Sequence, residues 1–204
     1  MADRAVDQPV DRADPLLRIL RNLGGHLAPH RHVDFDLIAG VARLRPDWSW
    51  LLVGPAIEST SKLNGLRNVI TIGRREHAEL PAIVSRFTVG AIPYLTGPSS
   101  RTVVPTKLNE YLACGRPVVS TRLPHCEEIA RECEDVIIAD GAPMGFATAI
   151  EKALESAHDQ DAIARRRSYA ATHSWNSLLE RMSEVIERVE RLRSDRTAHV
   201  VASN

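Results

Sequence analysis

The 204-residue chain lacks the features that mark secreted, membrane-spanning or nucleic-acid-binding proteins. It has three cysteines, Cys114, Cys126 and Cys133, and their spacing fits neither paired disulfides nor a C-x-x-C metal site. Lys plus Arg equals Asp plus Glu at 26 each, so no broad basic surface for nucleic acid is expected. No apolar run approaches the roughly 18 residues that span a bilayer, and the N-terminus has no signal-peptide core. These absences predict a cytoplasmic protein with reduced thiols, no transmembrane segment and no nucleic-acid partner.

Two common ligand motifs are also missing. No Gly-x-Gly-x-x-Gly follows a predicted strand, which argues against a dinucleotide-dependent dehydrogenase. His26, His30 and His32 lie close together in the sequence, but no carboxylate or cysteine with metal-ligand spacing accompanies them. We therefore expect neither a metal nor another cofactor.

Both ends of the chain are polar and without periodicity, which predicts a disordered arm over residues 1–15 and a flexible tail over residues 194–204. The segment between them, residues 16–193, is long enough for one sizeable domain. Within it, the basic cluster Arg165 to Arg167 falls in a helical pattern, and we interpret it as a solvated helix face.

Short apolar runs alternate with amphipathic segments along this domain. Such continuous apolar runs are typical of strands buried on both faces. Residues 17–24 form a weaker candidate strand, because two arginines interrupt it. A last amphipathic segment from Ser174 has a clear 3.6-residue period. The alternation predicts an α/β fold, a Rossmann-like parallel sheet with helices on both faces. Its strands are expected at residues 49–54, 68–73, 88–93, 117–121 and 135–139.

In such sheets ligands bind at the carboxyl ends of the strands. The loop after residues 88–93 leads into a short helix with Thr106 as the expected N-cap and Gly115 just past its end. Lys107 in its first turn suits a bound anion at the helix N-terminus, and Glu110, one turn further on the same face, could accept two hydrogen bonds from a ribose diol. The alternative is an ordinary Lys107–Glu110 pair worth about 0.2–0.5 kcal/mol.

The segment "VGAIPY…VPTKLNEYLACGRPVVSTRLP" resembles the C-terminal, donor-binding half of glycosyltransferases with the GT-B fold. It is most similar to the retaining, family 4-type enzymes that use nucleotide-diphosphate sugars, and the resemblance covers roughly residues 20 to 190. It implies sugar transfer from a UDP- or GDP-linked donor. Catalysis would depend on neutralising the leaving diphosphate, which the resemblance assigns to Lys107 and Arg31.

The resemblance also implies the donor-binding residues. Glu110 matches the second glutamate of a family pair spaced eight apart, which holds the ribose, whereas the first position is Thr102 in this chain. His125 and Glu128, after the strand at 117–121, are further candidates near the donor, and Tyr111 and Leu112 are expected in the core. The full donor-binding set comprises the phosphate loop Gly24 and Gly25, the base-contacting Gly73 and Arg74, the diphosphate turn Val103, Val104 and Pro105, and Thr102, Lys107 and Glu110.

A GT-B enzyme has a second, N-terminal domain that binds the acceptor, and we expect no segment of this sequence to form it. Three interpretations stay open: a donor half that works with an acceptor-domain partner, a nucleotide-sugar-binding module without chemistry, and an inactive truncated remnant. Apolar residues on the last helix are expected to be exposed in an isolated half, which predicts a partner protein or self-association. These residues are Trp175, Leu178, Leu179 and Met182.

Overall fold

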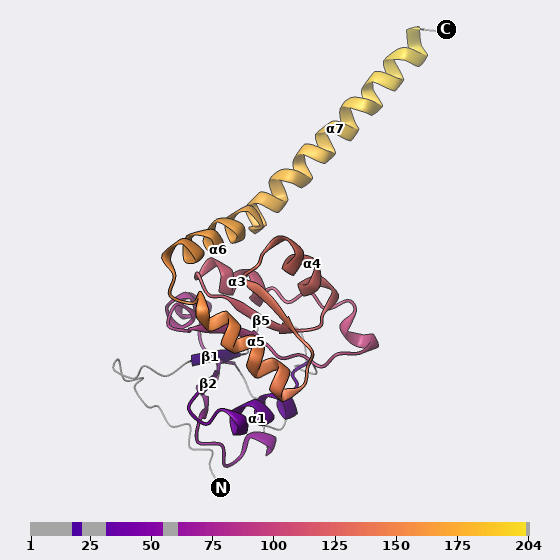
Figure 1. Cartoon of the computed structure of the whole chain (residues 1–204). Helices are drawn as coiled ribbons and strands as arrows, with labels where there is room; N and C mark the ends of the chain where they lie inside the picture. The colour runs from indigo at the N-terminus through magenta and orange to yellow at the C-terminus, as the bar shows by residue number, and fades with distance from the viewer. Residues whose placement is uncertain (1–17, 22–31, 55–60, 203–204) are drawn as a thin grey trace.

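The computed structural model describes the backbone of residues 18–21, 32–54 and 61–202, and the side chains of residues 32–54 and 61–191. Within this part the chain forms one parallel sheet with helices on both of its faces (Figure 1). The expected fold class is therefore confirmed. The strands are β1 (Arg18–Arg21), β2 (Ser49–Leu52), β3 (Val69–Thr71), β4 (Val89–Ile92), β5 (Val118–Thr121) and β6 (Val136–Ala139). The helices are α1 (Phe35–Leu44), α2 (Leu80–Val84), α3 (Lys107–Ala113), α4 (Pro124–Glu132), α5 (Pro143–Glu155), α6 (Gln160–Thr172) and α7 (Trp175–Ala202).

The sheet has the order β3-β2-β1-β4-β5-β6, and every described pairing is parallel. The order reverses between β1 and β4, so the carboxyl ends of these two strands flank a switch point of the kind where α/β proteins bind ligands. The segment that the sequence marked as a poor strand is thus the central one. Its four residues give little apolar signal, and only pairing with β2 and β4 places it there.

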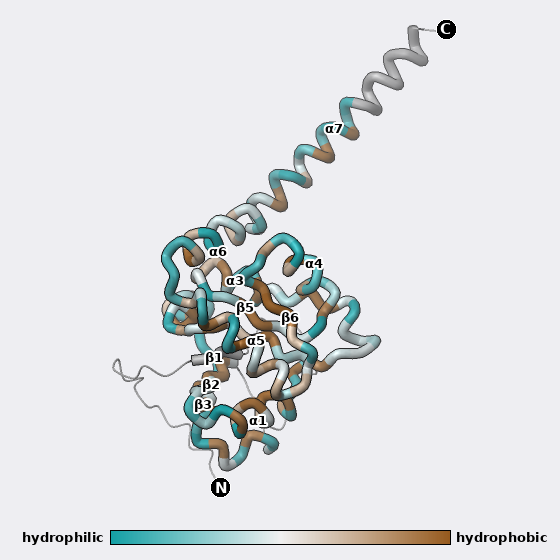
Figure 2. Tube along the Cα trace, viewed as in Figure 1, coloured by the Kyte–Doolittle hydropathy of each residue, from teal (hydrophilic) through white to brown (hydrophobic). Residues whose placement is uncertain are grey.

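Alternate residues of β2, β4 and β5 enter two separate cores. Trp50 and Leu52 face a core formed with α1 and α5, whereas Leu51 and Val53 face a second core under α3, α4 and α6. In β5, Val119 faces the first of these cores and Val118 faces the second. Burial of both faces explains why the strands read as continuous apolar runs (Figure 2).

The basic cluster on α6 corrects one expectation. Arg165 and Arg167 are exposed, but Arg166 is completely buried. Its Nε donates a hydrogen bond to Asp135 Oδ1 at 2.9 Å, and its Nη2 donates to the carbonyl oxygen and the hydroxyl of Ser156 at 2.8 and 2.6 Å. Asp135 precedes β6 and is itself buried, so a partner distant in sequence turns one residue of an apparently solvated face into a core residue.

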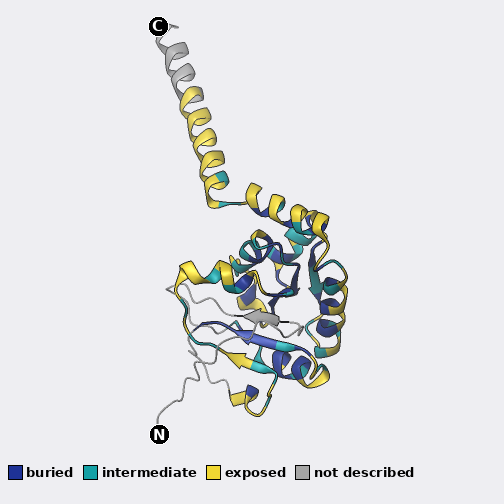
Figure 3. Cartoon of the chain, turned by 90° about the vertical axis from the view of Figure 1, so that its left-hand side faces the viewer, coloured by how far each residue is buried: buried dark blue, intermediate teal, exposed yellow. Residues whose placement is uncertain are grey.

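The last helix corrects a second expectation. The apolar period from Ser174 is confirmed, because α7 begins at Trp175, but the helix runs on to Ala202 through residues expected to form a flexible tail. No glycine or proline stands between 175 and 202 to end it. α7 projects away from the sheet and its covering helices (Figure 1), and its side chains are exposed along most of its described length (Figure 3).

Candidate functional site

The carboxyl end of β4 is held by backbone and hydroxyl contacts. Thr121, at the end of β5, donates its hydroxyl to the Tyr94 carbonyl at 2.7 Å and accepts from the Tyr94 N–H at 3.1 Å. On the other side, the Asp34 N–H donates to Pro93 O at 2.9 Å, and the Leu95 N–H donates to His32 O at 2.7 Å. The loop that follows β4 therefore starts from a fixed point at the switch of strand order.

Packing against the strand positions α3, the helix after this loop. Leu108, Tyr111 and Leu112 are fully buried beneath it, as expected for Tyr111 and Leu112. The Tyr111 ring lies so close to Gly90 of β4 that any Cβ at position 90 would overlap it. A glycine in the strand thus lets the helix approach closely.

The two ends of α3 differ in how well the sequence predicts them. Gly115 has φ +74° and lies just past the helix end, as expected, and the N–H groups of Gly115 and Arg116 donate back to Leu112 O and Tyr111 O in a Schellman motif. Thr106 does stand at the N-cap, but its side chain makes no capping hydrogen bond and its backbone is helical. The first turn instead closes through the Leu108 N–H, which donates to Pro105 O at 3.0 Å.

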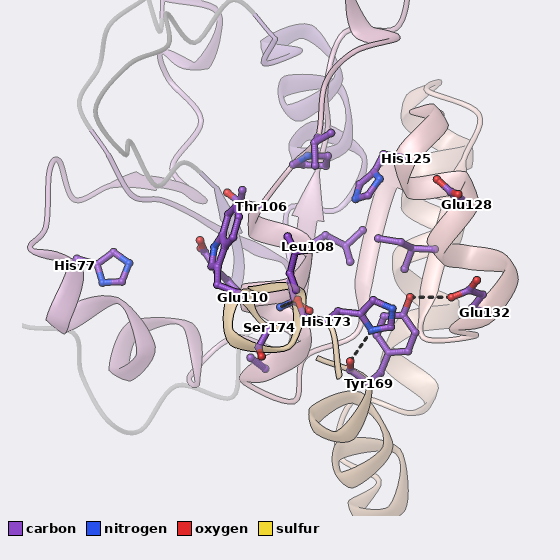
Figure 4. Close-up of a pocket in the computed structure, with 17 residues that line it drawn as sticks. His77, Thr106, Leu108, Glu110, His125, Glu128, Glu132, Tyr169, His173 and Ser174 are labelled. Carbon is purple, nitrogen blue, oxygen red and sulfur yellow. Dashed lines mark hydrogen bonds between the residues drawn. The ribbon is translucent and has the colours of Figure 1, made fainter. Parts of the chain in front are cut away.

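A pocket of about 670 Å³ lies against the outer surface of α3 (Figure 4). Glu110 lies in its wall, with His77 across from it and His125 near the opposite side, on α4. The end of α6 and the start of α7 complete the wall. The residues lining the pocket are His77, Val104, Pro105, Thr106, Leu108, Asn109, Glu110, Ala113, His125, Glu128, Ile129, Glu132, Tyr169, His173, Ser174, Trp175 and Leu178.

The environment of this pocket perturbs the pKa of Glu110. This side chain is half-buried, and burial raises its pKa above the ordinary value, although the positive charges of Lys107 and His77 act in the opposite direction. Among the described side chains it forms no ion pair, with Lys107 included. A half-buried carboxylate that faces a cavity without a partner can accept hydrogen bonds from a ligand.

The other expected site residues divide into three groups. Val104 and Pro105 line the pocket with Glu110, and so do His125 and Glu128. Lys107, Thr102, Val103, Gly73 and Arg74 are described but lie outside the lining, with Gly73 at φ +67° in the loop that leads to His77. Gly24, Gly25 and Arg31 lie outside the described residues, as do His26 and His30.

The sequence did not predict that the end of α6 forms part of the pocket wall. Tyr169 and His173 stack with ring centroids 4.2 Å apart, and the Tyr169 hydroxyl donates to Glu132 at 3.4 Å. Asn109 Nδ2 donates to the carbonyls of Ala170 and His173 at 3.4 and 3.3 Å and so holds this wall on α3. An aromatic pair four residues apart on a helix was the only available signal, and it does not reveal which helix lies opposite.

Comparison with known proteins gives the family. The family model described as "Glycosyl transferases group 1" matches residues 23–156, about two thirds of the chain. The chain belongs to the group 1 glycosyltransferases. A protein of Bacillus subtilis strain 168, named "Putative teichuronic acid biosynthesis glycosyltransferase TuaH", is 34% identical over 154 residues. That match covers 74% of this chain and 39% of the relative, so the chain spans about two fifths of the relative's length.

Solved glycosyltransferases share the fold. HepE of Anabaena in complex with UDP has a TM-score of 0.65 at 17% identity, over 85% of this chain and 49% of that one. Sucrose-phosphate synthase of Thermosynechococcus elongatus has a TM-score of 0.67 at 15% identity, over 87% and 46% respectively. At these identities the likeness concerns the fold alone, and it confirms the Rossmann-like architecture of this group 1 domain.

Two kinds of feature are absent from the described residues. In this part of the chain no helix has the length and hydropathy to cross a membrane. The same residues contain no group of three or more His, Cys, Asp or Glu side chains placed to hold a metal ion.

Proposed function

We propose that residues 16–193 are the C-terminal, donor-binding half of a retaining GT-B glycosyltransferase, which binds a UDP- or GDP-linked sugar. The position of Glu110 carries the proposal. It lies on the helix that follows β4, beside the switch of strand order, and it presents an unpaired, half-buried carboxylate to a pocket large enough for a nucleotide. The family match and the UDP complex of a fold neighbour support the same ligand class.

In this proposal Glu110 accepts hydrogen bonds from the two ribose hydroxyls, and His77 borders the nucleoside. Lys107 supplies positive charge to the diphosphate, together with Arg31 and the glycine loop at Gly24 and Gly25. Neutralising the leaving diphosphate is the main catalytic contribution that these residues can make. An acceptor-binding domain would complete the enzyme.

A nucleotide-sugar-binding module without chemistry is the second candidate. Position 102 favours it, because an exposed threonine hydroxyl stands where the resemblance expects a carboxylate against the donor sugar. Both candidates bind the nucleotide. Hydrolysis or transfer of a bound UDP-sugar, measured by release of UDP, separates them.

The test of the site is a thermal-shift titration with UDP, GDP and ADP. A ligand at one hundred times its dissociation constant adds about 2.7 kcal/mol, which corresponds to roughly 5–10 °C for a chain of this size. We expect one nucleotide to give a saturable shift that Glu110→Gln abolishes. Glu155→Gln, on the exposed end of α5, is the matched control and should leave the shift unchanged. A full shift in Glu110→Gln would refute the ribose role.

The pH dependence of binding follows from the raised pKa of Glu110. Only the ionised carboxylate accepts from both hydroxyls, so nucleotide affinity should fall as the pH drops through that raised value. Above its raised pKa, Glu110 is ionised in the folded state as well as in the unfolded state. Holding that charge in a half-buried position lowers the free energy of unfolding. Glu110→Gln should therefore leave the unliganded protein at least as stable at neutral pH, which a melt without nucleotide checks.

A further inference from the structure

The pocket on α3 has two sides of different composition (Figure 4). Glu110 and His77 lie toward one side, where the proposed function places the nucleoside. The other side, which we call the α4–α6 end, is formed by one face of α4 and by the end of α6. Its side chains are His125, Glu128, Glu132, Tyr169 and His173. The proposed donor site assigns no ligand to this end.

A preformed aromatic surface makes up the α6 part of this end. The rings of Tyr169 and His173 stack with centroids 4.2 Å apart, and the Tyr169 hydroxyl donates to Glu132 at 3.4 Å. Asn109 on α3 donates to the carbonyl oxygens of Ala170 and His173 at 3.4 and 3.3 Å. Burial, together with the Glu132 carboxylate, raises the pKa of Tyr169 to about 12, so its hydroxyl stays a donor. Contacts with α3 and α4 therefore hold the two rings in place before any ligand binds.

The α4 part of this end contributes hydrogen-bond acceptors. His125, Glu128 and Glu132 recur at intervals of three and four residues, so they share one face of the helix. Glu128 is exposed and forms no ion pair or side-chain hydrogen bond with any residue that the structure describes. An ionised carboxylate accepts hydrogen bonds and donates none, which suits the hydroxyl groups of a ligand.

The charge of the lining disfavours an anionic occupant. None of the described residues that line the pocket is a lysine or an arginine, whereas Glu110, Glu128 and Glu132 are carboxylates. A phosphate or carboxylate group at the α4–α6 end would therefore face like charges without a cation beside it. The faces of aromatic rings carry partial negative charge and attract the C–H groups of a sugar ring, while carboxylates accept from its hydroxyls.

We propose that the α4–α6 end binds an uncharged sugar ring, separately from the nucleoside at Glu110. The ring lies against Tyr169 and His173, and Glu128 accepts hydrogen bonds from its hydroxyls. The inference deepens the proposed function and rests on it for the position of the nucleoside, but binding of the sugar is tested without nucleotide. The sugar of the donor and a sugar of the acceptor share this chemistry.

Saturation-transfer NMR on the full chain tests the sugar. The neutral probes are the methyl glycosides of glucose, galactose, mannose and N-acetylglucosamine, and glucuronate is the anionic probe. We expect at least one neutral probe to bind at about 10 mM, the range of a weak small ligand, and glucuronate not to bind. No binding of any neutral probe, or equal binding of glucuronate, would overturn the proposal.

Two variants assign the bound sugar to this end of the pocket. Glu128→Ala and His173→Ala should each weaken the glycoside by about five- to tenfold, because one removes a charged acceptor and the other half of the aromatic surface. Both residues are exposed, so both variants should fold. Glu127→Ala is the matched control, because Glu127 pairs with Arg122 and lies outside the lining. Wild-type affinity in either Glu128→Ala or His173→Ala would also overturn the proposal.

Competition separates the two sources of the sugar. A glycoside that is displaced by the conjugate of the stabilising nucleotide with the same sugar, but not by the nucleotide itself, occupies the position of the donor sugar. A glycoside that neither displaces occupies an acceptor position. Displacement by the nucleotide itself would mean that the sugar shares the nucleoside side, which contradicts a separate site. If no nucleotide stabilises the chain, the proposed donor site fails, and the glycoside titrations with their variants still decide the sugar site.

Discussion

Arg166 shows at the residue scale how a charge can belong to the core. Its guanidinium contacts Asp135, Ser156 and the Gly115 carbonyl, which it reaches with Nη1 at 3.1 Å. It therefore joins α6 to the start of β6, the end of α5 and the turn after α3. Because Gly115 ends the helix that carries Glu110, this network also fixes one end of the candidate site.

Replacing Arg166 by methionine should destabilise the protein by about 3–5 kcal/mol, because Asp135 would keep a buried charge without its principal partner. Arg167→Met is the matched control: Arg167 is exposed, and its loss should change stability by no more than about 0.5 kcal/mol. Urea unfolding of both variants measures the difference. Equal, small losses would mean that Arg165 alone compensates Asp135, which it contacts at 3.1 Å.

Position 102 shows that a residue role known from a family does not apply at every matching position of this chain. The resemblance assigns this position to a carboxylate that contacts the donor sugar, and the chain has an exposed threonine there, outside the pocket lining. The second position of the same pair, Glu110, does face the pocket. The nucleoside end of the proposed donor site is therefore better supported by the structure than the sugar end.

At the scale of elements, contact between β4 and α3 determines where Glu110 lies. Gly90 removes a side chain from the strand so that Tyr111 can pack directly on its backbone. The helix is only seven residues long and has no side-chain cap, so it depends on this packing rather than on its own propensity.

Gly90→Ala should push α3 away from the sheet and destabilise the protein by about 1–3 kcal/mol, the usual cost of overpacking. It should also weaken nucleotide binding, because Glu110 moves with the helix. Gly97→Ala is the control for stability, since a Cβ there meets nothing within 4 Å. Chemical denaturation gives the stabilities, and the nucleotide thermal shift gives the binding. Wild-type stability in Gly90→Ala would show that α3 and Tyr111 adjust without strain.

On the scale of the whole molecule, the chain combines a packed α/β body with a helix whose described side chains are mostly exposed beyond its first turns (Figure 3). The body has two cores, one on each face of the sheet. α7 contributes only Trp175, Leu178 and the preceding Ser174 to the pocket wall. A helix in this situation is marginal in water unless another surface covers its apolar side.

Hydrogen exchange should therefore separate the two parts. Amides of α7 between Leu179 and Arg191 should exchange much faster than those of β4 and β5, because few contacts oppose local opening of this exposed helix. Mass spectrometry of the exchanged peptides measures both regions in one experiment. Equal protection of α7 and of the two strands would mean that another surface covers the helix.

The sequence by itself determined the fold class, five of the six strands, the C-terminal end of α3 and the exposure of the apolar residues at the start of α7, which are Trp175, Leu178, Leu179 and Met182. Each depends on a local pattern: apolar runs, a glycine after a helix, or a 3.6-residue period. Only the tertiary structure decided that the arginine-interrupted segment is the central strand, that Arg166 is buried, and that Tyr169 and His173 complete the pocket. Those three facts depend on which distant segment lies opposite, because pairing, a buried counter-charge and a shared cavity leave no periodic signal in one stretch of chain.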